Sequence, residues 1–143
     1  MKNIFQIIFL VFSSAIISQT LKSDKLKLIS VSDTVVFTVD MSGCFNAGIT
    51  IYKFAKQKNN DRIVIYKKAD ALFNKKITSK NYDVFVYRFR TSEFKFKHAD
   101  ENGKVCTTIS KFELGNQKQS VGFTNNTCEA EFNPEDFLLQ LLK

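Results

Sequence analysis

The apolar positions of this chain fall into short runs with a period of two, the pattern typical of strands that bury one face. Apolar and polar side chains alternate over Lys25–Val31 and Val35–Met41, with a turn at Ser32–Asp33 between them. Two β-branched runs follow, at Ile49–Phe54 and Arg62–Lys67. Because a parallel crossover needs about a dozen residues or more, these short connections predict a four-stranded antiparallel meander.

Residues 79–97 fit two patterns. Apolar side chains recur at the spacing of one helix face, at Tyr82, Phe85, Val86 and Phe89. The same stretch is also rich in good strand formers, and Phe94 and Phe96 alternate with lysines. Because the run is long for one strand, we predict a helix over Ser79–Ser92 and keep the strand as the alternative.

The last part of the chain predicts a hairpin and a helix. The hairpin strands are Val105–Leu114 and Ser120–Thr124, and the loop between them sets Leu114 opposite Ser120. Asn133 is placed to cap a terminal helix that starts at Pro134 and has an apolar stripe. The elements together predict an α+β fold, an antiparallel sheet of about five or six strands packed by a central helix and a C-terminal helix.

Residues 1–18 have the order of a secretory signal peptide: a cation at Lys2, an apolar run over Ile4–Ile17, then small and polar residues. The apolar run is shorter than the roughly 20 residues of a membrane-spanning helix, so we expect no permanent anchor. We predict cleavage between Ser18 and Gln19. The mature chain would then be a single domain, residues 19–143, in the periplasm or outside the cell.

The charge balance favours acidic partners. The chain has 21 Lys and Arg residues against 14 Asp and Glu, a net charge of +7. Most of the basic residues are lysines, whereas phosphate readers favour the bidentate fork of arginine. The composition therefore suggests a protein or a polyanionic ligand as partner and argues against nucleic acid.

One basic and aromatic stretch is the candidate site for an anionic ligand. Its cations, interleaved with aromatic residues, are Arg88, Arg90, Lys95 and Lys97. Aromatic rings between cations suit stacking beside an anionic backbone. An amphipathic element with phenylalanines facing inward and cations facing outward gives the same string, and this reading stays open.

Three cysteines in an exported chain leave at least one without a partner in the monomer. With Leu114 opposite Ser120, Cys106 faces Cys128 across the hairpin, which makes these two the candidate disulfide. Cys44 is then the candidate free thiol, and a nucleophile built from Cys44 and His98 is the catalytic alternative. No C-x₂-C pair supports a zinc site, and we find no motif for another metal, a cofactor or a catalytic group.

Three short motifs carry a resemblance: S-G-C-F at Ser42–Phe45, G-K-V-C-T-T at Gly103–Thr108 and N-N-T-C at Asn125–Cys128. In this order, before a leucine-rich terminal helix, they resemble small uncharacterised exported domains of envelope-bearing bacteria. The aromatics expected after the last cysteine are only partly present, as Phe132. The resemblance implies the fold and the location but no activity. The leading hypothesis is a non-catalytic exported binding or inhibitor-type module that uses loops and its exposed sheet face against a protein or an anionic ligand. The alternative is a thiol-dependent enzyme or redox protein that uses Cys44.

Overall fold

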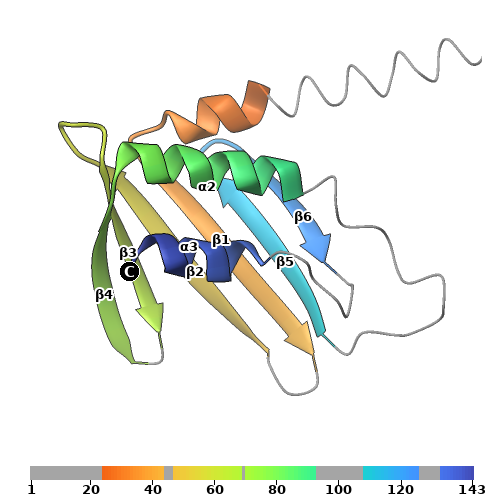
Figure 1. Cartoon of the computed structure of the whole chain (residues 1–143). Helices are drawn as coiled ribbons and strands as arrows, with labels where there is room; N and C mark the ends of the chain where they lie inside the picture. The colour runs from red at the N-terminus through yellow and green to blue at the C-terminus, as the bar shows by residue number, and fades with distance from the viewer. Residues whose placement is uncertain (1–23, 44–46, 69, 93–107, 126–132) are drawn as a thin grey trace, which may run out of the picture.

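The computed structural model describes residues 24–43, 47–68, 70–92, 108–125 and 133–143 (Figure 1). Six antiparallel strands form one sheet in the order β4-β3-β2-β1-β5-β6. The strands are β1 (Thr34–Gly43), β2 (Gly48–Lys56), β3 (Arg62–Lys68), β4 (Ala71–Ile77), β5 (Thr108–Gly115) and β6 (Ser120–Asn125). The helices are α2 (Ser79–Ser92), α3 (Pro134–Leu141) and a short helix at residues 24–30. The α+β prediction with an antiparallel sheet is therefore confirmed.

An aromatic core lies between the sheet and α2. Phe37, in the central strand β1, is fully buried, and its ring contacts four other buried aromatic rings: Tyr52, Phe85, Phe89 and Phe112. Alternate residues of each strand point into this layer, as the two-residue period of the sequence requires. The sheet therefore uses one face for the core, and α2 and α3 cover that face (Figure 1).

The helix prediction for Ser79–Ser92 is correct. Before the helix, the Thr78 hydroxyl accepts a hydrogen bond from the Asn81 amide, and Asp61 accepts one from the Ser79 amide at 2.9 Å. These contacts satisfy amides that have no partner within the helix. Asp61 also pairs with Lys76 at 2.9 Å. This contact is the main reason why the pKa of the Asp61 carboxyl lies below its usual value, and the hydrogen bond from the Ser79 amide lowers it further.

The start of α3 agrees with its sequence signal. The Asn133 side chain accepts hydrogen bonds from the Glu135 and Asp136 amides, and proline occupies the first turn. The Tyr52 hydroxyl donates a 2.5 Å hydrogen bond to Glu135, which ties α3 to β2. Burial is the main cause that raises the pKa of Tyr52 well above its usual range, and the hydrogen bond to the Glu135 carboxylate raises it further.

The strand predicted at Lys25–Val31 is wrong, because residues 24–30 are helical. Leu26 and Ile29 are buried, whereas Leu28 is 60% exposed. A spacing of three between buried residues fits one face of a helix, and the apparent alternation came from Leu28, which does not face the core. The fourth strand of the meander is instead β4, which no pattern had indicated.

The predicted hairpin register is also wrong, by one residue. Leu114 lies opposite Val121, and Gly115 pairs with Ser120 as the last residue of β5. The turn is therefore shorter than the Gly115–Gln119 loop that the sequence suggested. Cys106 and Cys128 lie outside the described residues, so their pairing stays a prediction. The register that set them opposite each other is not the one observed.

Tyr82 gives the fold a testable dependence on pH. Its hydroxyl is buried and hydrogen-bonds to no described residue, and burial raises its pKa from 10 to about 12 even though Arg62 acts in the opposite direction. The folded protein thus holds this proton more tightly than the unfolded chain does. The free energy of unfolding should be highest below pH 10 and fall by about 2–3 kcal/mol as the pH rises toward 12.

Urea unfolding of Tyr82→Phe at a series of pH values checks this expectation. The variant should be as stable as the wild type at pH 7, or more stable by about 1 kcal/mol, because it removes an unpaired buried hydroxyl. It should lose less stability between pH 10 and 12, with the remaining slope due to groups such as Tyr52. An alkaline slope equal to that of the wild type would contradict the assignment.

Candidate binding face

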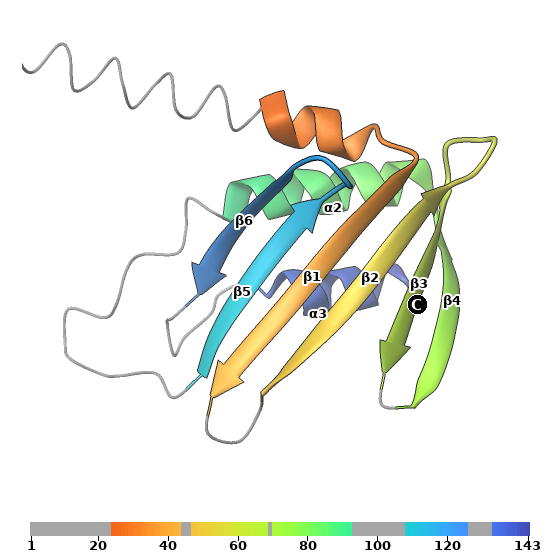
Figure 2. The ribbon, with the colours of Figure 1, turned by 180° about the vertical axis from the view of Figure 1, so that it is seen from behind.

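The face of the sheet opposite α2 and α3 is covered by no described helix (Figure 2). We call it the open face. Residues on it alternate with core residues, so Val36 and Thr38 of β1 lie on it between the buried Val35, Phe37 and Val39. The strand registers then assign every other strand residue to the core or to the open face.

The open face is rich in large aliphatic side chains. Of the large apolar residues that are exposed in the described part of the chain, four lie on it: Ile49 (66%), Ile51 (46%), Leu72 (69%) and Ile109 (39%). Val36, Ile63 and Ile65 lie half-buried among them. Exposed apolar side chains gathered on one surface mark an interaction site more reliably than scattered ones do.

Charged groups are distributed unevenly across this face. Lys53 and Lys67 lie on β2 and β3, whereas Asp40 and Glu113 lie on β1 and β5. Lys67 also pairs with Asp70 at 3.5 Å, but both side chains are more than half exposed, so this pair adds little stability. Lys111 also lies on this face, on β5 opposite Asp40, so the side of β2 and β3 is cationic and the side of β1 and β5 has both signs of charge.

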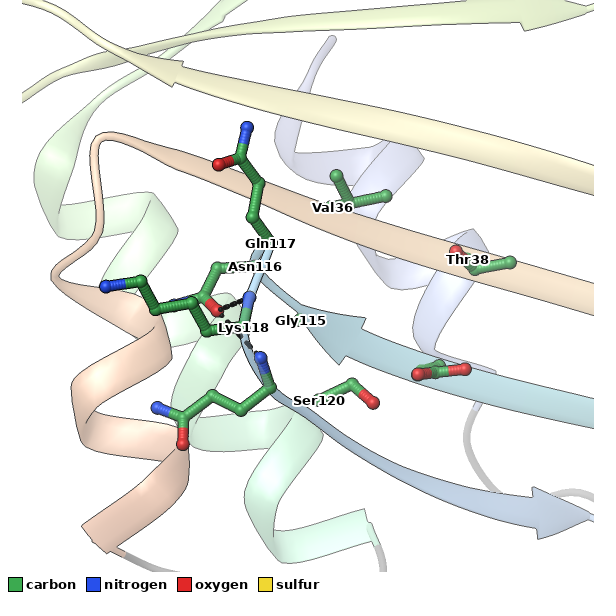
Figure 3. Close-up of a pocket in the computed structure, with 9 residues that line it drawn as sticks. Val36, Thr38, Gly115, Asn116, Gln117, Lys118 and Ser120 are labelled. Atoms are coloured by element: carbon green, nitrogen blue, oxygen red, sulfur yellow. Dashed lines mark hydrogen bonds between the residues drawn. The ribbon is translucent and has the colours of Figure 1, made fainter.

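A hollow of about 390 Å³ opens on this second side, where β1 and β5 meet the β5–β6 turn (Figure 3). Val36, Thr38, Glu113 and Ser120 surround it, and the turn residues close one end. The turn is held by Asn116, whose side-chain oxygen accepts hydrogen bonds from the Lys118 and Gln119 amides. Its side-chain nitrogen donates to the Ser32 hydroxyl at 2.9 Å, which joins the turn to the segment after the N-terminal helix.

On this side of the face, two strand positions are occupied by glycine, so no side chain projects from the sheet there. A Cβ at Gly115 would lie 2.7 Å from the Cβ of Ser120, and one at Gly122 would lie 2.6 Å from the Phe112 carbonyl oxygen. Both distances are too short for a side chain without a shift of the neighbouring strand. Gly115, itself buried, therefore adds no side chain to the lining of the hollow.

The predicted anionic-ligand site is only partly described. Arg88 and Arg90 are both exposed on α2, but residues two apart on a helix are separated by roughly 200° around its axis. The helix therefore does not present these two guanidinium groups on one side. The other predicted site residues lie outside the described part of the chain: Lys95, Lys97, Cys44, Cys106, Cys128 and His98.

The described residues offer neither a metal site nor a membrane-spanning helix. Within them, no three acidic, cysteine or histidine side chains lie close enough to hold a metal ion. No helix in this part of the chain is both long and apolar enough to cross a membrane.

No family model matches the chain, and no curated protein matches it. The resemblance to exported envelope domains therefore stays an expectation.

The sequence predicts an exposed sheet face as a binding surface but indicates none of the residues that lie on it. A signal for these residues was present, because β3 has aliphatic residues on both faces, as in Ile63–Ile65, and β2 has Ile49 and Ile51 on the face opposite Tyr52 and Phe54. A sheet with helices on one side needs only one apolar face. Two-sided apolar strands in a chain with few helices therefore indicate a surface that another molecule covers.

Proposed function

We propose that this protein is a non-catalytic exported binding module that holds a protein partner on its open face. The observation that carries the proposal is the presence of Ile49, Ile51, Leu72 and Ile109 on the sheet face that no described helix covers. Burying aliphatic surface contributes about 25 cal/mol per Å², so such a face favours association. The lysines and carboxylates around it would set the orientation of the partner.

A protein fits this face better than a polyanion does. The described open face has both cations and carboxylates, and four of its aliphatic residues are exposed. A phosphate or sulfate polymer would instead require a continuous track of cations. Glu113, beside the hollow, would repel such a polymer.

Export is part of the proposal. Residues 1–18 have the order of a signal peptide, and the first described residue that reaches the core is Leu26, a short distance beyond the predicted cleavage site. The Cys106–Cys128 disulfide would suit an oxidising compartment. The proposed location is the periplasm or the extracellular space.

A photo-reactive amino acid at position 51 tests whether the open face binds a protein. Illumination of the exported protein in its native cell fraction should give a covalent adduct of defined mass, because Ile51 lies near the middle of the face. The same amino acid at position 87 is the control, since Tyr87 is 63% exposed on α2, on the other side of the sheet. It should give little of this adduct.

Two further variants show what holds the partner. Ile49→Lys places a charge in the aliphatic surface and should lower the adduct yield at least about fivefold. Arg90→Ala changes an exposed cation on α2 and should leave the yield unchanged. If position 51 gives no adduct, or if positions 51 and 87 give the same one, the open face is not the binding site.

A further inference from the structure

We infer that the partner of the open face is a second copy of this chain, an inference that rests on the function proposed above. A two-fold symmetric interface uses the same patch on both copies, so that patch must complement itself. An interface with an unrelated protein has no such requirement. Two rows of residues across the strands show self-complementarity, one in both charge and size and the other in size.

The strand registers place six residues in one row across the open face. From β4 to β6 the row consists of Leu72, Lys67, Ile51, Thr38, Glu113 and Gly122. One end of the row has a 69% exposed leucine beside a cation. The other end has a carboxylate beside a glycine. The two ends therefore differ in the sign of their charge and in the height of their side chains.

The neighbouring row repeats the difference in height. Ile65 of β3 and Gly115 of β5 lie in it, each one strand out from the central pair β2 and β1. Gly115 lines the hollow together with Val36, Thr38 and Glu113 (Figure 3). An aliphatic group and a place to receive one thus lie on opposite sides of the same face.

One symmetry operation brings these features together. A two-fold axis along the strands, between β1 and β2, exchanges β3 with β5 and β4 with β6. It sets Lys67 against Glu113 of the second copy and Ile65 above the second copy's hollow. Leu72 then faces the second copy's Gly122.

The twist of the sheets is compatible with these contacts. Packed sheets are rotated by about 30° relative to one another. At β3 and β5, roughly 7 Å from the axis at the usual strand spacing, this rotation moves facing residues by about 4 Å. A lysine side chain spans that distance. The face of six strands offers on the order of 600 Å² per copy, close to the roughly 800 Å² per partner of a standard interface.

Exchanging the two charges tests the dimer. Sedimentation equilibrium of the exported protein, over about a hundredfold range of concentration, should show a species of twice the chain mass. Lys67→Glu and Glu113→Lys should each weaken the dimer at least about tenfold, because like charges then meet at both symmetry-related contacts. The double variant K67E/E113K should restore the affinity to within about threefold of the wild type.

The restoration separates this arrangement from an effect on folding. Within one copy, Lys67 and Glu113 are three strand spacings apart, roughly 14 Å, so they cannot pair directly. Both side chains are exposed, and circular dichroism should show that each variant folds. The control Leu28→Lys changes a 60% exposed aliphatic residue outside the sheet and should not affect the dimer.

Three results would overturn the inference: a wild type that stays monomeric, a dimer that neither single variant weakens, or a double variant that stays weak. The cross-link at position 51 separates this failure from that of the proposed function. An adduct with a different protein, together with a monomeric wild type, rules out the second copy but keeps the binding module. A monomeric wild type without an adduct rules out both.

Discussion

Replacing Phe37 with alanine should lower the free energy of unfolding by about 3–5 kcal/mol, as expected for a large cavity in a core. Phe37 is fully buried in the central strand, with Phe85 of α2 at 5.3 Å and Tyr52 of β2 at 5.7 Å between ring centroids. Phe112 of β5 stacks at 6.4 Å on the other side. The substitution therefore removes a contact shared by three strands and a helix.

The loss is a large part of the stability of a domain of this size, which is typically about 5–15 kcal/mol. Urea unfolding followed by circular dichroism measures it. Tyr87→Ala removes an aromatic ring of similar size that is 63% exposed, so it should change the stability by less than about 0.5 kcal/mol. A Phe37→Ala protein within about 1 kcal/mol of the wild type would mean that the aromatic cluster does not organise the core.

The elements that the sequence predicts correctly are those in which one local signal agrees with burial. Tyr82, Phe85 and Phe89 are all buried, so the helical spacing of their positions corresponds to a real contact face. The cap of α3 depends only on neighbouring residues, Asn133 and the two amides that it accepts from. Neither feature requires knowledge of distant parts of the chain.

The errors occur where burial is decided by a distant segment. The edge strand β4 buries only Ile77 fully, so its sequence shows no alternation, and pairing with β3 is what makes it a strand. At residues 24–30 the sequence suits a strand, but the contacts of Leu26 and Ile29 with the core select a helix. The hairpin register depends on Gly115, which extends β5 by one residue beyond the predicted strand.

The candidate site is harder to predict for a related reason. Ile51 and Phe54 are both apolar residues of β2, yet one is 46% exposed and the other fully buried. The difference depends on which face α2 and α3 cover, and this is set by the packing of the whole chain. Sequence can therefore show that a strand has two apolar faces, but only the structure shows which face is open.

Arg62 is a buried cation that links the N-terminal helix to the sheet. Its replacement should also lower the free energy of unfolding strongly. It is 3% exposed, and its guanidinium donates a 2.8 Å hydrogen bond to the carbonyl of Ser30, in the last turn of that helix. Its central carbon lies 4.2 Å from the ring centroid of Tyr82 on α2. A cation suits both partners, the negative end of a helix and the face of an aromatic ring.

Arg62→Ala should therefore lower the free energy of unfolding by about 3 kcal/mol, since it takes the hydrogen bond from the half-buried Ser30 carbonyl and removes the cation from the Tyr82 ring. Arg62→Lys keeps the charge but loses the planar fork, and should lower it by about 1–2 kcal/mol. The matched control Arg90→Ala, at an exposed position of α2, should have an effect below about 0.5 kcal/mol.

Hydrogen exchange shows where the stability is lost. In Arg62→Ala, amides of residues 24–30 should lose protection more than those of β1 and β2, because the substitution frees the helix before it opens the sheet. Leu26 and Ile29 still bury their side chains, so the helix should not detach completely. If protection at residues 24–30 is unchanged while the rest of the protein is destabilised, Arg62 supports the core through Tyr82 alone and does not hold the N-terminal helix.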